Sequence, residues 1–106
     1  MQQGNVFFND ELAGVIEKVG KKYTFCYQQS YFQNPHTKPI SLTFPKTQQI
    51  YQGDYLFPFF FNMLPEGHNK KVICRLLKID ENDYFTLLIK IAHSETVGAV
   101  TVREIK

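Results

Sequence analysis

The sequence predicts an α+β fold, in which two to three helices pack on one face of a mostly antiparallel sheet. Three observations lead to this fold class. Apolar and polar residues alternate in the N-terminal part, helix-like patterns fill residues 55–93, and a β-branched run follows at residues 99–105. Strands that come before helices, with one strand returning at the end, are typical of helices gathered on one side of a sheet. With 106 residues, the chain is expected to form a single domain, 1–106.

The N-terminal part reads as a run of antiparallel strands. Residues 5–9 and 12–18 are short runs separated by Asp10 and Glu11. The stretch KKYTFCYQ then alternates with a period of two, which is the period of a strand. One face carries Tyr23, Phe25 and Tyr27, and the other carries Thr24 and Cys26.

Residues 29–64 give weaker signals. Two prolines interrupt Gln29–Pro39 and disfavour helix before them, so we expect a loop there. Alternation returns at Ile40–Phe44 and ends at Pro45, which predicts a short edge strand. Residues 55–64, YLFPFFFNML, fit one or two helical turns with Pro58 in the first turn, although their four phenylalanines would also suit a strand.

Two further helices are predicted after the break at Pro65–Gly67. Residues 68–79 form an amphipathic helix with an apolar face and a solvated basic face. The apolar face consists of Val72, Ile73, Leu76 and Leu77, and the basic face of Lys70, Lys71, Arg75 and Lys78. Asp80 is expected to cap the last helix, with Asp83 adding negative charge near its start. That helix, residues 84–93, is apolar on most sides and should be largely buried.

Catalytic and cofactor motifs are missing from the sequence. There is no glycine-rich phosphate loop, and there is neither a kinase catalytic loop nor its metal-binding triplet, so we expect no enzyme activity and no cofactor. The histidines His36, His68 and His93 lack zinc-like spacing, so we expect no metal. Cys74 with His68 or His93 has the right residue types for nucleophilic catalysis, but a buried packing thiol explains Cys74 better.

Composition narrows the remaining classes. Twelve basic and ten acidic residues give a formal charge of +2, which is too even to indicate a dedicated nucleic-acid surface. A nucleic-acid-binding module stays open as an alternative, because the tyrosines, the phenylalanines and the basic helix face could stack on and contact a single strand. The longest apolar run is too short to span a membrane, and the first residues do not resemble a signal peptide. Cys26 and Cys74 should be free thiols. We expect a cytoplasmic protein.

Four segments in this order resemble the N-terminal domain of HipA-type serine/threonine kinase toxins. They are VFFNDELAGVIEK, YFQNPHTKPISLTFP, FFFNMLPEG and DENDYFTLLIKIAHSETVGAVTV, which together span nearly the whole chain. In that family the domain precedes a kinase domain, and no kinase segment follows Val102 in this sequence. The chain is therefore expected to be free-standing.

A free-standing domain of this kind resembles the HipS-type antitoxins of HipBST toxin–antitoxin systems. The resemblance implies a non-catalytic antitoxin that neutralises a HipT-type kinase toxin, with a HipB-type DNA-binding protein in the same complex. It implies no direct nucleic-acid or membrane partner. The alternative within the family is the N-terminal domain of a full-length HipA-type kinase toxin.

The turn after the aromatic run is the candidate partner interface. Its residues are Leu64, Pro65, Glu66, Gly67, His68, Asn69, Lys70 and Lys71. A fixed proline, a carboxylate and an imidazole on a surface turn form a projection that fits a partner's cleft. The alternative is a tight connection between two helices, in which Gly67 only relaxes the backbone.

Overall fold

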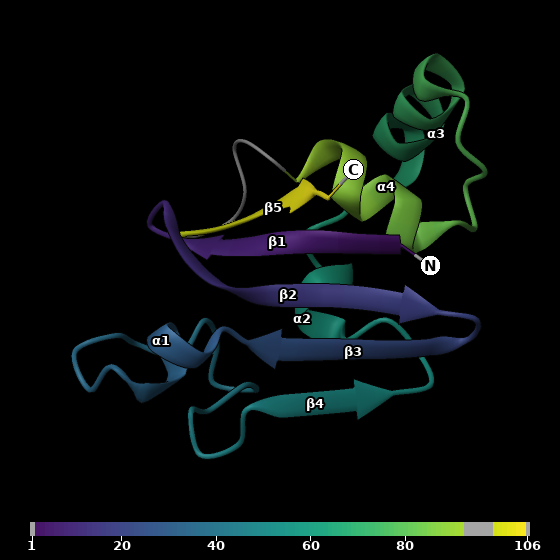
Figure 1. Ribbon diagram of the computed structural model, residues 1–106. Helices are drawn as coiled ribbons and strands as arrows, with labels where there is room; N and C mark the ends of the chain where they lie inside the picture. Colours follow the sequence, from purple (N-terminus) through teal and green to yellow (C-terminus); the bar gives the residue numbers. More distant parts are fainter. Residues whose placement is uncertain (1, 93–98, 106) are drawn as a thin grey trace.

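A five-stranded antiparallel sheet forms the body of the molecule. The computed structural model describes residues 2–92 and 99–105, and its strands lie in the order β4-β3-β2-β1-β5 (Figure 1). Their bounds are β1 Gln2–Phe8, β2 Glu11–Val19, β3 Lys22–Tyr27, β4 Ile50–Gly53 and β5 Val100–Glu104. The expected antiparallel sheet is confirmed, and the last strand returns to lie beside the first.

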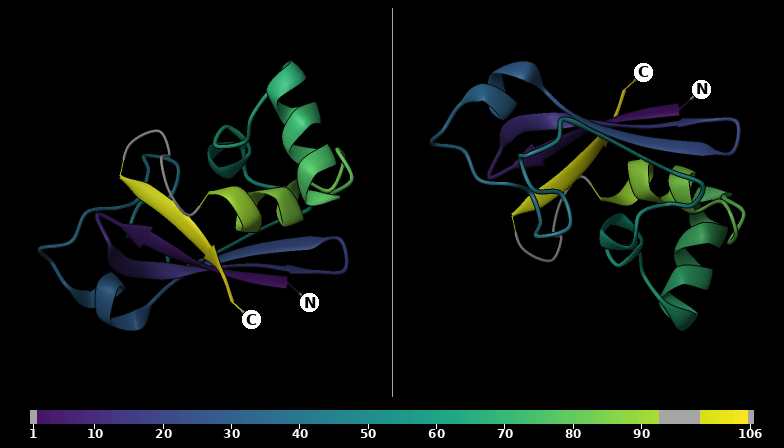
Figure 2. Two further views of the ribbon diagram at one scale, coloured as in Figure 1. Left: turned by 90° about the horizontal axis from the view of Figure 1, so that it is seen from above. Right: turned by 90° about the horizontal axis from the view of Figure 1, so that it is seen from below.

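Three of the four helices in the described residues lie on one side of the sheet. The helices are α1 Gln29–Gln33, α2 Pro58–Phe61, α3 Gly67–Leu77 and α4 Tyr84–Ile91. Figure 2 shows α2, α3 and α4 on one side, and α1 at the end of the sheet toward the other side. This arrangement confirms the predicted α+β class with helices gathered on one face.

The core lies between the sheet and helices α2 and α4. Alternation in β3 sends Phe25 and Tyr27 inward, where Phe25 packs against Phe60 of α2 with ring centroids 5.8 Å apart. From α4, Phe85 is fully buried and lies 6.1 Å from the Tyr23 ring. The predicted helix near residue 58 is confirmed with Pro58 in its first turn, where a missing N–H costs no helical hydrogen bond.

The edge strand predicted at residues 40–44 is wrong. Ile40 and Phe44 are buried, but Leu42 between them is 97% exposed, because a turn at Ser41–Phe44 replaces the alternation. The edge position belongs instead to β4, which pairs with β3. Tertiary hydrogen bonds fix this irregular segment: the hydroxyls of Tyr27, Tyr31 and Tyr51 donate to the backbone carbonyls of Phe44, Lys38 and Pro45, respectively.

The loop expected at residues 29–39 also begins differently. Residues 29–33 form the short helix α1, in which Tyr31 is buried and stacks on Tyr27 with centroids 5.9 Å apart. The prolines Pro35 and Pro39 lie beyond this helix, so the signal that indicated a loop applies only to the second part of the segment.

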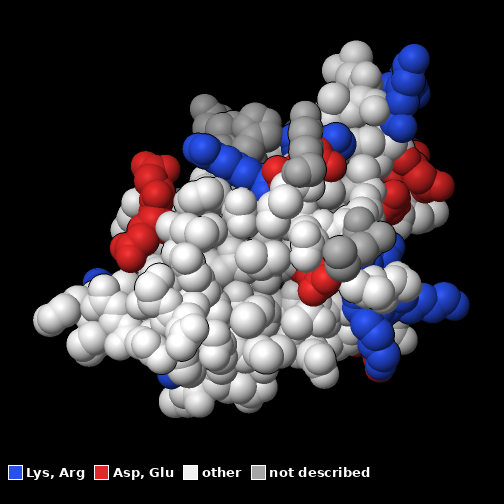
Figure 3. Space-filling view, viewed as in Figure 1, with Lys and Arg blue, Asp and Glu red and all other residues white. Residues whose placement is uncertain are grey.

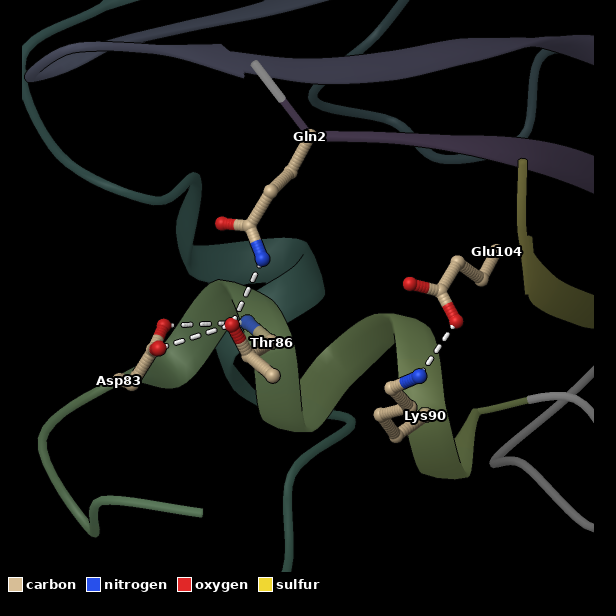
Figure 4. Close-up of polar contacts among 5 residues, drawn as sticks. All are labelled: Gln2, Asp83, Thr86, Lys90 and Glu104. Atoms are coloured by element: carbon tan, nitrogen blue, oxygen red, sulfur yellow. Dashed lines mark hydrogen bonds and ion pairs between the residues drawn. The ribbon is translucent and has the colours of Figure 1, made fainter. Parts of the chain in front are cut away.

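Helix α4 is tied to both ends of the chain (Figure 4). Asp83, not Asp80, is its N-cap: the Asp83 carboxylate accepts from the Thr86 N–H at 3.2 Å and from the Thr86 hydroxyl at 2.8 Å. The Gln2 amide donates to the same hydroxyl at 2.8 Å. The expected Asp80 cap is therefore wrong, since that carboxylate accepts from the Asn82 N–H within the preceding turn.

Helix α4 ends near the last strand. Lys90 pairs with Glu104 of β5 at 2.7 Å, so the helix is held against β1 and β5 at its two ends. The four residues Phe85, Leu87, Leu88 and Ile89 are buried, which confirms the expectation of a largely buried helix. His93, predicted as the end of that helix, lies outside the described residues.

Candidate partner-binding surface

The turn between α2 and α3 lies on the surface and is anchored at its base. Leu64 is buried, and its N–H donates to the Phe61 carbonyl at 3.1 Å. Gly67 has a φ of +59°, and a Cβ there would meet open space, so glycine is needed for the backbone and not for close packing. Gly67 therefore allows a backbone conformation that other residues rarely adopt, which is the role it has in the alternative of a tight connection between two helices.

Five of the eight predicted interface residues are exposed. Glu66, Gly67, His68, Asn69 and Lys71 are exposed, Pro65 and Lys70 are half-buried, and Leu64 is the buried anchor. His68, Asn69, Lys70 and Lys71 belong to the first turns of α3 and not to the connecting turn. The structure thus divides the predicted segment into a short turn and the beginning of a helix.

A small aromatic pocket lies beneath this turn. Its volume is about 170 Å³, and its lining is Phe61, Leu64, Pro65, Glu66, Gly67, Lys70 and Tyr84. The Lys70 ammonium lies 4.8 Å from the centre of the Tyr84 ring, and Phe61 meets the same ring edge-on at 5.2 Å. Ligand pockets in proteins are roughly 300–1,000 Å³, so this one suits a single inserted side chain better than a cofactor.

Sequence reasoning missed two residues of this pocket, Phe61 and Tyr84. Tyr84 follows the cap of α4, far along the chain from the turn, and no local pattern places it there. Phe61 lies in the aromatic run, and the available signal was that Phe59, Phe60, Phe61 and Leu64 cannot all face inward on one short helix. The structure agrees, because Phe60 is buried and Phe61 is 43% exposed.

Helix α3 projects away from the sheet beside this pocket (Figure 1). Cys74 is buried and Ile73 is half-buried, so the side of α3 that carries these two residues packs against the rest of the molecule. Val72, Leu76 and Leu77 are exposed. Of the four residues of the predicted apolar face, only Ile73 is half-buried and packs against the core, beside the buried Cys74.

Among the described residues, Cys74 and His68, the pair considered for nucleophilic catalysis, are not brought together. Cys74 is buried on the inner side of α3, whereas His68 is exposed. Both cysteines are free, and burial, followed by the negative charge of Glu17, raises the pKa of the Cys26 thiol. Within residues 2–92 and 99–105, no three His, Cys, Asp or Glu side chains gather in a way that could hold a metal ion.

Charges of both signs are dispersed over the surface seen in Figure 3. Acidic side chains gather at the β1–β2 turn and next to α3, basic ones lie at the β2–β3 turn and on α3, and a broad uncharged area covers β2 to β4. No helix in the described part of the chain is long and apolar enough to cross a membrane.

Comparison with known proteins shows which family this domain belongs to. Residues 4–103 match the model of the HipA N-terminal domain family. The chain belongs to the HipA N-terminal domain family. The predicted resemblance to that family is thereby confirmed at the level of the domain.

Two similar proteins cover the chain fully. A solved structure described as "N-terminal domain of HipA toxin" matches with a TM-score of 0.75 and 29% identity, covering 100% of this chain and 94% of that one. A protein of Haemophilus influenzae described as an "Uncharacterized protein" is 32% identical over 106 residues, which is 95% of its own length. That relative is therefore about as long as this one domain.

Proposed function

We propose that this HipA N-terminal domain is a non-catalytic antitoxin-like protein that binds and neutralises a HipT-type serine/threonine kinase toxin. The observation that carries the proposal is the Haemophilus influenzae relative, of which the match covers 95%. A protein of that length has no room for a kinase domain beside this one. Such a domain can act on a kinase only as a separate chain. A HipB-type DNA-binding protein would join through the kinase.

The absence of chemistry is part of the proposal. The sequence has no phosphate-binding loop or kinase catalytic loop. The purified chain should therefore neither hydrolyse ATP nor transfer phosphate. Phosphorylation that persists after contaminating kinases are removed would contradict this.

The proposed interface includes the segment from Leu64 to Lys71. Its exposed residues Glu66 and His68 stand at the start of α3, above a pocket whose base is anchored by Leu64. If a few well-packed contacts dominate the interface, losing one costs about 2 kcal/mol, which is about thirtyfold in affinity.

Two substitutions test this interface. His68→Ala and Glu66→Ala each change an exposed side chain, so both variants should melt at the wild-type temperature. Each should bind a cognate HipT-type kinase about thirtyfold more weakly and fail to restore growth of cells that express it. His36→Ala and Glu11→Ala are matched controls, because both are exposed and lie at the other end of the molecule. If both test variants bind the kinase and restore growth like the wild type, the segment only connects α2 and α3 and is not part of the interface.

A second candidate function is that of the N-terminal domain of a full-length HipA-type kinase toxin. The similar solved structure favours it, because that protein is described as a domain of a HipA toxin. The neighbouring reading frames separate the two: a short separate kinase gene supports the antitoxin, and an in-frame continuation into a kinase supports the domain. A nucleic-acid-binding module is the weaker alternative, since the charges are dispersed; tight, sequence-dependent binding by the chain alone would support it.

A further inference from the structure

Helix α3 carries an apolar ridge that faces away from the rest of the molecule. His68, Val72 and Leu76 follow one another at a spacing of four, so they form one row along the helix. All three are exposed, and Leu76 is 74% exposed. Cys74, on the other side of the helix, is the residue that packs inward. The ridge is therefore not part of the core.

This ridge has the pattern of a docking helix. Helices that bind in a groove insert side chains that are three or four residues apart along one face, and an i, i+4, i+8 row lies on such a face. Isolated helices of fewer than about 12–15 residues are marginal in water, and α3 has 11 residues of which only Cys74 is fully packed against the body. Covering the ridge would stabilise the helix as well as bury Val72 and Leu76.

The charges beside the ridge indicate what covers it. Lys71 and Arg75 form the neighbouring row at the same spacing, and Lys78 follows at the end of the helix. Residues 67–77 contain no acidic side chain. Asp80 and Glu81, just after the helix, line a depression together with Lys71 and Arg75, but the ion pairs among the described residues do not include these two cations. A partner surface that meets this face is complementary when it carries carboxylates alongside its apolar contacts.

A second copy of this chain is a poor occupant. Two α3 helices packed ridge to ridge in antiparallel orientation would place Lys71 and Arg75 of one copy next to the same cations of the other. In parallel orientation these cations would meet the opposite flank of the other helix, which offers no carboxylate, because residues 67–77 contain none. Like charges brought together at an interface cost binding free energy. The complementary partner is a different protein.

We propose that the outward ridge of α3, His68, Val72 and Leu76, docks into an apolar groove whose rim carries carboxylates, on the kinase of the proposed function. The inference rests on that function and extends it, because it adds a helix face beyond the Leu64–Lys71 segment and states the chemistry of the kinase surface. The helix is about 16 Å long, so its outer face alone covers less area than the roughly 800 Å² per partner that a standard interface buries. The turn before it continues the same surface through His68.

The apolar part is tested by Val72→Ser and Leu76→Ser, made together. Leu76 is 74% exposed and Val72 is 38% exposed, so the thermal melt should fall only slightly while affinity for the kinase falls at least tenfold. Leu42→Ser is the matched control, because Leu42 is 97% exposed and lies in the segment before β4, away from α3. A double variant that binds like the control would overturn the proposal.

The charged part is tested by Arg75→Glu, with Lys21→Glu in the β2–β3 turn as the exposed control. Arg75→Glu should weaken binding at least tenfold at low salt, and the difference from wild type should shrink as salt rises. Equal binding by both charge variants at low salt would overturn the acidic rim.

Two outcomes separate this inference from the function on which it rests. If the wild-type chain binds and inhibits the kinase while the ridge variants do so equally well, the function stands and the ridge is not the interface. If the wild-type chain does not bind the kinase, both proposals fall. Self-association of the wild-type chain that the ridge variants abolish, measured by sedimentation, would assign the ridge to a second copy and contradict the charge argument.

Discussion

Replacing Tyr27 with phenylalanine tests how the irregular segment before β4 is held. The Tyr27 hydroxyl is buried, donates to the Phe44 carbonyl and accepts from the Ile40 N–H at 3.1 Å. The Tyr27→Phe ring can keep its edge-on contact with Phe25, whose centroid lies 4.9 Å away. The substitution therefore removes two hydrogen bonds and leaves the packing in place.

The expected loss of stability follows from the two backbone groups that lose their partner. A buried polar group left without a hydrogen bond costs about 1–3 kcal/mol. We expect the free energy of unfolding of Tyr27→Phe to fall by about 2 kcal/mol. For a chain of about 100 residues, this corresponds to a fall in Tm of roughly 8 °C.

The pH dependence of stability is an independent test of the Tyr27 hydroxyl. Burial raises the pKa of Tyr27 to about 12, against the lowering effect of the bond from the Ile40 N–H. Between pH 10, near the pKa in the unfolded chain, and pH 12, the unfolded state loses this proton while the folded state keeps it. Stability contributed by the neutral hydroxyl is therefore complete below pH 10 and is lost as pH rises toward 12. In Tyr27→Phe this contribution is absent, so the alkaline decline should be shallower.

The assay is urea unfolding followed by far-UV circular dichroism at pH 7, 9 and 11. Tyr55→Phe is the control, because Tyr55 is 84% exposed and should behave as wild type. Burial also raises the pKa of Tyr31, so the variant should retain part of the alkaline decline. A loss below about 0.5 kcal/mol at pH 7, together with an unchanged alkaline slope, would refute the account of how Tyr27 holds this segment.

Three further outcomes are expected. Gly14→Ala should lower the free energy of unfolding by at least about 1–3 kcal/mol, because its Cβ would lie 2.3 Å from the Cys26 carbonyl oxygen; a urea midpoint equal to that of Gly53→Ala would contradict this. Asp83→Ala should cost about 1 kcal/mol in a thermal melt through the lost cap, and more than Asp80→Ala; the reverse order would be evidence against the assigned cap. Amide exchange followed by NMR should be faster in α3 than in α4 of the free chain and should slow in α3 when the kinase is added; equal protection in the free chain would show that α3 is packed as firmly as α4.

Local patterns predicted those elements whose signal lies within a few residues. The alternation of residues 22–27 identified β3 and its inward face, because the strand period of two is fixed by backbone geometry. Pro58 marked the first turn of α2, and the apolar character of residues 84–91 predicted the burial of α4. The turn at Pro65–Gly67 was also readable, since glycine with positive φ and proline act locally.

Other features depended on residues that are distant in the sequence. The alternation at residues 40–44 resembles that of a strand, yet tyrosine hydroxyls from β3 and α1 hold this segment in turns, and β4 takes the edge. Asp80 and Asp83 are both good capping residues, and the choice between them was made where Thr86 meets Gln2 of β1. Propensity alone does not distinguish such alternatives, because the deciding contacts cross the molecule.

The candidate surface shows the same division most clearly. The sequence by itself predicted an amphipathic helix over residues 68–79 after an exposed turn, and the structure has this helix at Gly67–Leu77, since helical periodicity and the turn residues are local properties. Which side of that helix meets the body was decided by tertiary structure. Leu64 and Ile79 anchor its two ends so that Cys74 turns inward, and Val72 and Leu76 are left facing outward. Periodicity defines an apolar face, but only the packing of the flanking segments determines whether the core covers it or leaves it exposed.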